Sequence, residues 1–229
     1  MKVEKEFSKI ASLIGDKARS IILWSLLDGK AYTATELAGF ADISRQSVSN
    51  HLSKLIDANL VIADKQGRHK YFRLANEQVA QVVESMASLI AIQKIETKKS
   101  VAAQKLTFSR TCYDHLAGKL SVDLVKSLLD NKIIISKDTT FEVTDFGKDW
   151  FRELGIEVDT LKNKKRSFAH KCIDWTERKH HIAGALGAAI LENFLENDWI
   201  RRKQYSREIV ITALGKRKLF ELLNISIDH

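Results

Sequence analysis

The fold is decided by residues 33–57, which read TATELAGFADISRQSVSNHLSKLID. Thr33 and Glu36 have the spacing of a capping box, in which each side chain satisfies a free backbone donor near the other, so a short helix is predicted over about 34–40. After a linker of a few residues, a second helix is predicted from Arg45 to Asp57. Two helices joined by a tight turn indicate a helix-turn-helix.

The second predicted helix has an apolar face and a polar face. Its apolar residues recur every three or four positions and predict one buried stripe: Val48, Leu52, Leu55 and Ile56. The polar side chains are of the types that match base-edge donors and acceptors in a major groove. Base contacts are predicted for Arg45 and Gln46, then for Ser49 and Asn50, with His51 in the same polar set. Phosphate contacts are predicted for Ser44, which also caps the helix, and for Ser47 and Lys54. Any short polar helix carries such residues, so the helix alone leaves its function open.

A basic hairpin is predicted directly after this helix. Residues 60–63 are typical of a strand, 64–68 of a turn, and 69–74 of the returning strand. Positive and imidazole side chains crowd this hairpin, where they could follow the DNA backbone or enter the minor groove: Lys65, Arg68, His69, Lys70 and Arg73. The order helix, turn, helix and basic wing predicts a winged helix-turn-helix that binds double-stranded DNA.

Helices are predicted on both sides of this module. Apolar residues between Phe7 and Leu27 recur at helical spacing, with a break at Gly15 and Asp16 that favours two helices. A long helix is predicted from Glu77 to about Leu106. The first domain is therefore predicted to span residues 1–106 and to include a dimerisation surface.

The second half of the chain contains an internal repeat. His115-Leu-Ala-Gly-Lys-Leu120 matches His181-Ile-Ala-Gly-Ala-Leu186. Further along, Val143-Thr-Asp-Phe-Gly147 matches Ile211-Thr-Ala-Leu-Gly215 after a small change in length. Self-similarity at a fixed spacing indicates a domain built from copies of one unit.

Each copy is predicted to form a helix, a two-stranded piece and a closing helix, as in a winged helix. The copies are placed at about 107–160 and 170–229, and the basic segment 161–166 is the expected link between them. The predicted fold class is therefore mainly α with small β-hairpins (α+β), with a winged helix-turn-helix followed by a C-terminal domain of two winged-helix-like repeats over 107–229.

Composition narrows the class of protein. The 229 residues carry a formal net charge of +8, which favours anionic partners because cations set against phosphates release counterions. The chain shows no secretory signal and no apolar run long enough for a membrane span. Two cysteines in a chain of this length indicate a reducing compartment, so we expect a cytoplasmic protein with no membrane partner.

The first domain resembles the ArsR/SmtB family of bacterial regulators. The resemblance rests on Thr35-Glu-Leu-Ala38, on Ile43–Leu55 with its S-x-x-S-x-H-L pattern, and on the wing Gly67-Arg-His-Lys-Tyr-Phe-Arg-Leu74. It covers about residues 7–95. It implies a homodimer, built on the first and last helices of the domain, that binds an imperfect palindrome and represses transcription until a metal or another stress signal releases it.

The familiar metal sites of that family are not matched. Members that bind soft metals carry Cys-x-Cys in the helix before the recognition helix, where this chain has Ala38-Gly-Phe40. Others use Asp and His on the last dimer helix, yet residues 85–100 contain neither. Any sensing is therefore expected in the C-terminal domain.

The candidate sensor residues are Cys112, His115, Cys172 and His181. Cys112 and His115 are three positions apart and would share a face on a helix. The set could bind zinc or a soft metal, or the two thiols could form a redox pair. It could equally be a packed interface between the copies, in which the cysteines act as small apolar residues.

Three further possibilities remain for the C-terminal half. It could hold a small-molecule pocket lined by Tyr113 and Trp175, with Asp174 and Glu177 nearby. It could be a DNA-targeted enzyme, although no Gly-rich phosphate loop, nucleophile elbow or His-Glu-x-x-His motif occurs, so no catalytic residues are predicted. It could also be a protein-interaction module without a ligand.

Overall fold

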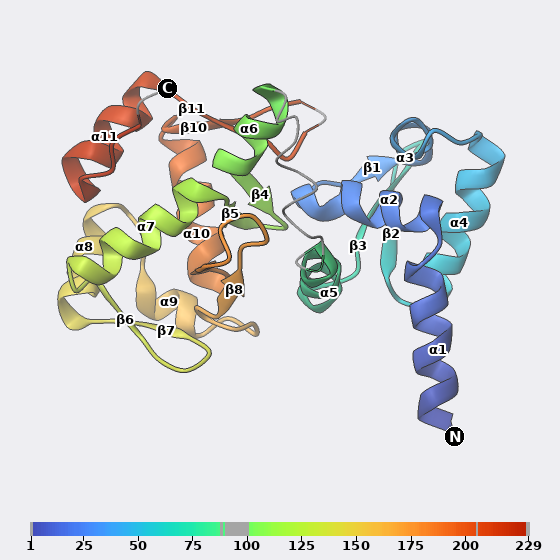
Figure 1. The fold of residues 1–229 in the computed structure, drawn as a ribbon, viewed down its shortest axis with the longest axis horizontal. Coiled ribbons are helices and arrows are strands. Elements are labelled where there is room, and N and C mark those ends of the chain that lie inside the picture. Colours follow the sequence, from blue (N-terminus) through green and yellow to red (C-terminus); the bar gives the residue numbers. More distant parts are fainter. Residues whose placement is uncertain (1, 88, 90–100, 205, 228–229) are drawn as a thin grey trace. The chain divides into compact units, whose positions relative to one another are not determined.

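The computed structural model describes residues 2–87, 89, 101–204 and 206–227, with only the backbone described for 101–104. Contacts divide the chain into two compact units, residues 1–86 and 87–229 (Figure 1). We call these the head and the C-terminal unit and describe each by itself. The predicted boundary, near residue 106, lies further along the chain. No helix among the described residues has the length and apolar content needed to cross a membrane.

The helices of the head follow the predicted pattern. The break at Gly15 and Asp16 is confirmed, because Asp16 caps the second helix by accepting a hydrogen bond from the Arg19 backbone N–H at 3.0 Å. The predicted helix from Glu77 to Leu106 is described in two pieces, and its residues 88 and 90–100 lie outside the described residues. The elements are α1 (Lys2–Ile14), α2 (Lys17–Ser25), a 3-10 turn η1 (Leu26–Asp28), α3 (Ala34–Ala41), α4 (Arg45–Asp57), α5 (Glu77–Ala87) and, in the C-terminal unit, α6 (Val101–Phe108).

Both predicted caps of the helix-turn-helix are present. The Thr33 hydroxyl accepts from the Glu36 backbone N–H at 3.4 Å, and the Glu36 carboxylate accepts from the Thr33 backbone N–H at 2.8 Å. α3 ends at Ala41. Its C-cap residue, Asp42, has a φ of 51°, in the left-handed region that Asp tolerates better than most residues. Ser44 then caps α4 by accepting from the Ser47 backbone N–H.

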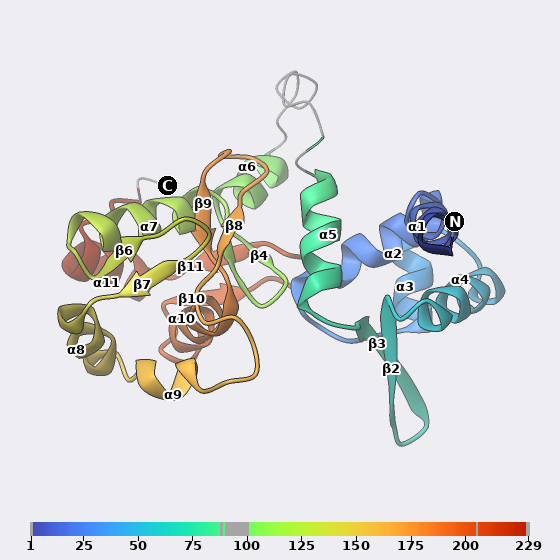
Figure 2. The ribbon, with the colours of Figure 1, turned by 90° about the horizontal axis from the view of Figure 1, so that it is seen from below.

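The wing covers the predicted residues, but its first strand is longer and its turn shorter than predicted. β2 (Val61–Gln66) and β3 (His69–Leu74) pair out to Gln66 and His69, which leaves only Gly67 and Arg68 as the turn instead of 64–68. A strand that the sequence did not predict, β1 (Tyr32–Thr33), joins the other edge of β3. Figure 2 shows the resulting hairpin projecting from the helices of the head.

In the C-terminal unit, the order hairpin, helix, hairpin, helix occurs twice. The predicted order of helix, two-stranded piece and closing helix is present in each segment, but each segment begins with a hairpin that the sequence did not predict. The first segment contains β4 (Arg110–Cys112), β5 (His115–Ala117), α7 (Lys119–Asp130), β6 (Ile134–Ser136), β7 (Phe141–Val143) and α8 (Asp145–Glu153). After α9 (Val158–Lys162), the second contains β8 (Lys171–Ile173), β9 (His180–Ile182), α10 (Gly184–Glu196), β10 (Ile200–Arg202), β11 (Ile209–Ile211) and α11 (Ala213–Leu223).

Matching interactions recur at equivalent positions of the two segments. The Thr144 hydroxyl caps α8 by accepting from the Gly147 backbone N–H at 2.9 Å, and Thr212 does the same for Gly215 at the start of α11. A Cβ on Gly215 would lie 1.9 Å from the Trp199 carbonyl oxygen, so the backbone approaches too closely for a side chain. One apolar core contains residues from both segments and from α9 between them.

Candidate nucleic-acid interface and candidate metal centre

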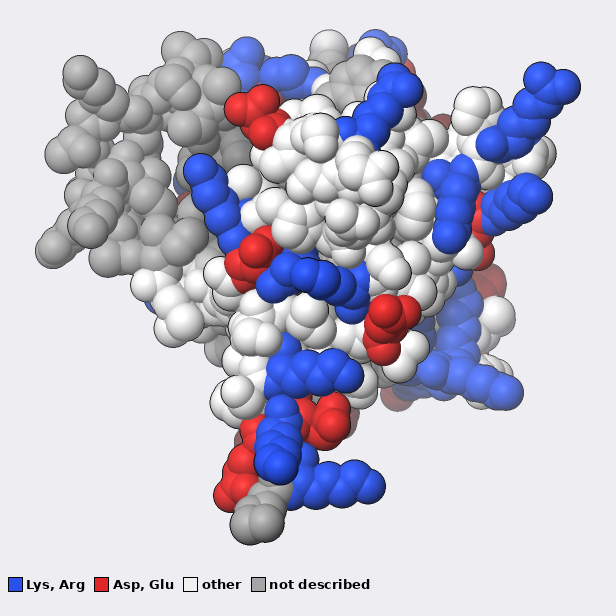
Figure 3. Space-filling view, turned by 90° about the vertical axis from the view of Figure 1, so that its right-hand side faces the viewer, with Lys and Arg blue, Asp and Glu red and all other residues white. Residues whose placement is uncertain are grey.

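The two faces of α4 are separated as predicted, except that Ile56, predicted to be buried, is half-buried. Val48, Leu52 and Leu55 are buried against the head. The opposite face exposes polar side chains that were predicted to contact DNA: Ser44, Arg45, Gln46, Ser49, Asn50 and Lys54. Figure 3 shows the side of the head on the right of Figure 1, where α4 runs and from which Lys and Arg side chains project.

Three residues of the predicted polar set also have partners within the head. The Ser44 hydroxyl is occupied as the α4 cap, and the Ser49 hydroxyl donates to the Arg45 carbonyl oxygen at 3.0 Å. His51 is half-buried, and its Nδ1 lies 3.6 Å from the Asp16 carboxylate at the start of α2. His51 is therefore placed to fix α4 against α2.

The wing carries a concentration of exposed positive charge. Lys65 and Lys70 are directly opposite each other on β2 and β3, and both are exposed. Like charges at opposite positions repel, so this pairing is unfavourable unless an anion lies nearby. Arg73 differs, because its guanidinium Nε donates to the Asp64 carboxylate at 3.0 Å.

A groove lies between α4 and the wing. Its volume is about 540 Å³, and it is bounded by the start of α3, one side of α4 and the tip of the wing. The residues that line it are mainly hydroxyl-bearing or basic: Thr33, Ala34, Thr35, Ser49, Leu52, Ser53, Ile56, Arg68, His69, Lys70 and Phe72. Hydroxyls, backbone donors at a helix start and cations are the groups that bind phosphate oxygens in protein–DNA complexes.

Two helices of the head expose apolar side chains. Val3 and Phe7, one helical turn apart on α1, are 80% and 74% exposed. Val82 and Met86, one turn apart on α5, are also exposed. Single exposed apolar residues are common, but pairs at this spacing form an apolar stripe along a helix.

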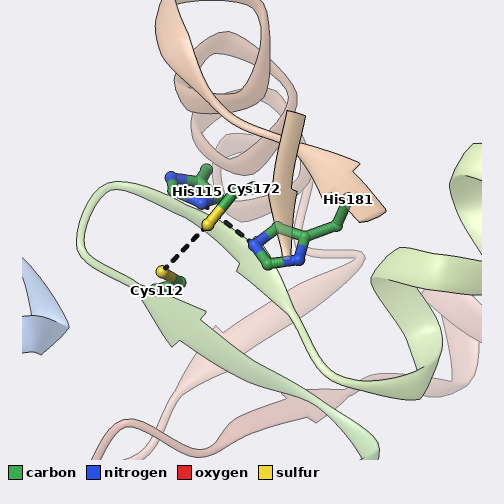
Figure 4. Close-up of side chains that lie close together, drawn as sticks. All are labelled: Cys112, His115, Cys172 and His181. Atoms are coloured by element: carbon green, nitrogen blue, oxygen red, sulfur yellow. Dashed lines mark hydrogen bonds between the residues drawn. The ribbon is translucent and has the colours of Figure 1, made fainter. Parts of the chain in front are cut away.

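The four candidate sensor residues come together in the C-terminal unit (Figure 4). The predicted helical relation of Cys112 and His115 was wrong, because they are opposite each other across the β4–β5 hairpin, whose turn is Tyr113 and Asp114. Cys172 and His181 are opposite each other across β8–β9 in the same way. Each hairpin therefore presents one thiol and one imidazole on the same face.

The ligand atoms of the four side chains point towards a common centre. The two Sγ atoms are 4.0 Å apart, and the two imidazole Nε2 atoms are 3.1 Å apart. One ligand atom from each residue can be chosen so that all four lie within 4.8 Å of one another. Cys112, His115 and His181 are buried, and Cys172 is half-buried.

A carboxylate lies near the Nδ1 atom of each imidazole. Asp114 Oδ1 lies 3.5 Å from His115 Nδ1, and the Arg166 guanidinium donates to this carboxylate at 2.5 and 3.4 Å. Asp174 Oδ2 lies 4.0 Å from His181 Nδ1. In both imidazoles Nε2 faces the centre of the cluster, but only His115 Nδ1 is within hydrogen-bond distance of a carboxylate.

Asp174 is the hub of a buried polar network. Its carboxylate accepts from the Arg110 guanidinium at 2.7 Å and from the Gly118 backbone N–H at 2.7 Å, and neither charged side chain is exposed. The Arg110 guanidinium also lies over the Trp175 ring, 4.6 Å from its centroid. Trp175, predicted to line a pocket, is thus packed under Arg110, while Tyr113 occupies the β4–β5 turn.

The electrostatics of the cluster are uneven. Burial lowers the pKa of His115, but the Cys112 thiolate and the Asp114 carboxylate outweigh it and raise this pKa to about 10. Burial, followed by the positive charge of His115, holds the pKa of His181 well below its ordinary value. Burial raises the pKa of Asp174, yet Arg110 and the hydrogen bonds to the carboxylate lower it strongly overall.

Sequence reasoning missed the ion pairs that cross the cluster. Arg110 belongs to the first segment and Asp174 to the second, whereas Asp114 pairs with Arg166 from the predicted link. A signal was present, because Phe108-Ser-Arg-Thr-Cys112 matches Phe168-Ala-His-Lys-Cys172. These matching segments lie just before the repeat. They are separated by fewer residues than the two copies of the repeat are, because the β8–β9 loop is longer than the β4–β5 turn.

Comparisons with known proteins find a family match within the head. The family model described as "Bacterial regulatory protein, arsR family" matches residues 16–63, which include the helix-turn-helix. The HTH-type transcriptional regulator KmtR of Mycobacterium tuberculosis (strain ATCC 25618 / H37Rv) is 37% identical over 75 residues, covering 33% of this chain and 57% of the relative. Among solved structures, NolR from Sinorhizobium fredii is 22% identical with a TM-score of 0.37, covering 39% of this chain and 88% of that one.

One relative matches almost the whole chain. YdfF of Bacillus subtilis (strain 168), described as an uncharacterized HTH-type transcriptional regulator, is 45% identical over 221 residues, which are 96% of this chain and 98% of the relative. The likeness therefore includes the C-terminal unit as well as the head. The chain belongs to the arsR family of bacterial regulatory proteins and is a DNA-binding transcriptional regulator.

Proposed function

We propose that the protein is a homodimeric, cytoplasmic repressor that binds an operator palindrome and is released when its C-terminal unit receives a signal. The observation that carries this proposal is the exposed polar face of α4 beside a basic wing, with a groove between them. A helix of this kind fits the major groove, and the wing can follow the adjacent backbone.

The residues divide by the contact that each can make. Arg45 and Gln46 lie in the first turn of α4, which reaches base edges in helix-turn-helix complexes, and Ser49 and Asn50 continue that face. Ser47 and Lys54 on α4, and Lys65, Arg68, His69 and Lys70 on the wing, are assigned to the phosphate backbone. Phosphates would also relieve the repulsion between Lys65 and Lys70.

A second copy of the chain is the proposed partner of the apolar stripes on α1 and α5. Covering Val3, Phe7, Val82 and Met86 removes exposed apolar area from water, which stabilises an association of matching surfaces. Two heads related by a two-fold axis would place two α4 helices on successive half-sites of a palindrome. The C-terminal unit is assigned to signal reception, with Cys112, His115, Cys172 and His181 as its centre; no catalytic role is proposed.

The DNA-binding assignment is tested on the protein's own upstream DNA. Fluorescence anisotropy and footprinting of the full chain should detect a protected palindrome, and the double variant Arg45→Ala/Gln46→Ala should lose that sequence preference. Lys126→Ala is the matched control, because Lys126 is an exposed cation on α7 that pairs with Asp130 one helical turn away. Equal loss in Lys126→Ala, or wild-type binding that does not distinguish the palindrome from random DNA, would argue against the proposal.

The dimer is tested separately. Phe7→Glu should shift the protein from dimer to monomer in analytical ultracentrifugation, because it places a charge on the α1 stripe. Phe146→Glu is the control, since Phe146 is similarly exposed but lies on α8. A wild-type protein that is monomeric at micromolar concentration would refute the homodimer.

A further inference from the structure

The two buried hairpins build one site with four converging ligands. Register pairing places Cys112 beside His115 on the first hairpin and Cys172 beside His181 on the second. Both pairs face the same point, although they are far apart in the sequence (Figure 4). Because neither hairpin has more than two of these ligands, the site exists only when the two segments of the C-terminal unit are together.

The spacing fits a tetrahedral ion. With metal–sulfur bonds near 2.3 Å and metal–nitrogen bonds near 2.05 Å, the edges of a tetrahedron would be about 3.8 Å between sulfurs and about 3.3 Å between nitrogens. The corresponding separations here are 4.0 Å and 3.1 Å. Two opposite edges of the tetrahedron are therefore already formed by the folded chain.

The two imidazoles direct nitrogen atoms at the centre of the site. Asp114 Oδ1 lies 3.5 Å from His115 Nδ1 and so leaves Nε2 of that ring towards the centre, whereas Asp174 Oδ2, 4.0 Å from His181 Nδ1, lies beyond hydrogen-bond distance. The two Nε2 atoms lie 3.1 Å apart, so a proton lies between them when no metal is bound. A divalent cation can take the place of that proton and be bound by both Nε2 atoms, and a carboxylate next to the other ring nitrogen, as Asp114 is for His115, is a usual support of a metal-bound histidine.

The two carboxylates also connect the site to the rest of the C-terminal unit through ion pairs. Asp114 is held by Arg166, and Asp174 is held by Arg110, so each carboxylate is neutralised and oriented by a separate arginine. These ion pairs connect the first segment with the residues that follow it. A shell of this kind fixes imidazole orientation before a metal arrives.

We propose that Cys112, His115, Cys172 and His181 bind one zinc-class divalent ion in tetrahedral geometry, and that this ion is the signal received by the C-terminal unit. Two thiolates and two imidazoles form a donor set typical of zinc and of related thiophilic ions, whereas calcium and magnesium require oxygen ligands. The half-buried Cys172 leaves one side of the site accessible to an incoming ion. The signal role rests on the proposed function, but the binding itself does not.

Metal binding is therefore measured without DNA. The full chain, reduced and stripped with a chelator, is titrated with Co(II), which reports tetrahedral thiolate ligation through intense visible bands and a near-ultraviolet charge-transfer band, and then with Zn(II), which should displace it. We expect one ion per chain for each metal. Elemental analysis of the dialysed Zn(II) protein should give the same ratio.

Neighbouring histidines provide a matched pair of variants. His181→Ala should weaken Zn(II) binding at least 100-fold and change the Co(II) spectrum, whereas His180→Ala should keep both, because His180 is exposed and pairs with Ile173 outside the cluster. Cys112→Ser/Cys172→Ser should abolish the charge-transfer band. Should a variant unfold, the wild-type spectrum still decides the matter, since a wild type that binds no Co(II), or binds it without thiolate bands, overturns the proposal whether or not the protein binds DNA.

Discussion

The wing and the β4–β5 hairpin are both antiparallel hairpins with two-residue turns, yet they use their side chains in opposite ways. The wing is exposed over most of its length and carries unbalanced positive charge. Both strands of β4–β5 are buried throughout, and the charges of Arg110 and Asp174 beside them are paired. Two hairpins of the same local fold thus differ in burial, which in our proposals suits the wing to a large anionic partner and β4–β5 to a small enclosed ion.

The two hairpins also differ in how their charged side chains are paired. In the wing, like charges lie opposite each other, as Lys65 and Lys70 do. Around β4–β5, charges have internal counter-charges, as Arg110 and Asp174 do. Exposed charges of the first kind contribute little to folding, whereas in the second kind the loss of one partner leaves the other charge buried and uncompensated.

The largest expected effect comes from the buried ion pair. Asp174→Asn leaves Arg110 charged and fully buried without its counter-charge, so the free energy of unfolding of the C-terminal unit should fall by about 3–5 kcal/mol. Urea unfolding followed by circular dichroism measures this change. Asp64→Asn, which breaks the exposed pair with Arg73 in the wing, should change stability by less than about 1 kcal/mol. Similar losses of stability in the two variants would contradict the proposed difference between the wing and the C-terminal unit.

Close backbone packing in the C-terminal unit gives the next effect. Gly215→Ala forces a Cβ against the Trp199 carbonyl and should destabilise the unit by about 1–3 kcal/mol. Gly39→Ala, in α3 of the head, meets no atom within 4 Å and should stabilise the protein by about 0.5–1 kcal/mol through reduced chain entropy. Thermal unfolding of both variants is the check, and a neutral Gly215→Ala would show that the start of α11 can shift.

The next prediction concerns the affinity for DNA, and the expected change in binding free energy is similar in size to the change in stability predicted for Gly215→Ala. Arg45→Ala should weaken operator binding roughly 10- to 100-fold, or about 1–3 kcal/mol, and reduce discrimination at one base pair in each half-site. Competition with a set of single-base operator variants measures both quantities. Weaker binding with unchanged discrimination would reassign Arg45 to the phosphate backbone.

The smallest effect is expected in the wing. Lys65→Ala should lower operator affinity modestly and lower the slope of log affinity against log salt by about 0.9 for each phosphate that is no longer neutralised, so by about 2 for a dimer. Anisotropy over a series of salt concentrations measures the slope. Lys126→Ala removes the same charge from α7 and should leave the slope unchanged; a parallel decrease would mean that net charge matters more than the wing.

The head could be predicted from sequence because its signals are local. The Thr33 capping box, the Ser44 cap and the apolar stripe of α4 each lie within a few residues, and all are present in the structure. The two-stranded pieces β6–β7 and β10–β11 were predicted from the repeat, but the β4–β5 and β8–β9 hairpins were not. The β4–β5 turn, for example, is Tyr113 and Asp114, with Tyr113 at a φ of 57° and no glycine to mark it.

The sequence predicted which four residues form the candidate metal centre, but not how they are arranged. All four ligands were named, but their geometry depends on cross-strand register and on packing between segments, which spacing alone does not encode. The pair of Arg110 and Asp174 was missed for the same reason, because it joins residues that are distant in the chain. Local patterns predict elements, whereas the supports of a site arise from tertiary packing.

The most direct test of the account is the operator affinity of the full chain as a function of Zn(II), compared between wild type, His180→Ala and His181→Ala. An allosteric coupling of about 1–3 kcal/mol corresponds to a 5- to 150-fold change in affinity. We predict that Zn(II) weakens operator binding by roughly that factor in wild type and in His180→Ala, and has no effect on His181→Ala. An affinity that is independent of Zn(II) in wild type, or an equal response in His181→Ala, would contradict the assignment of metal sensing to the C-terminal unit.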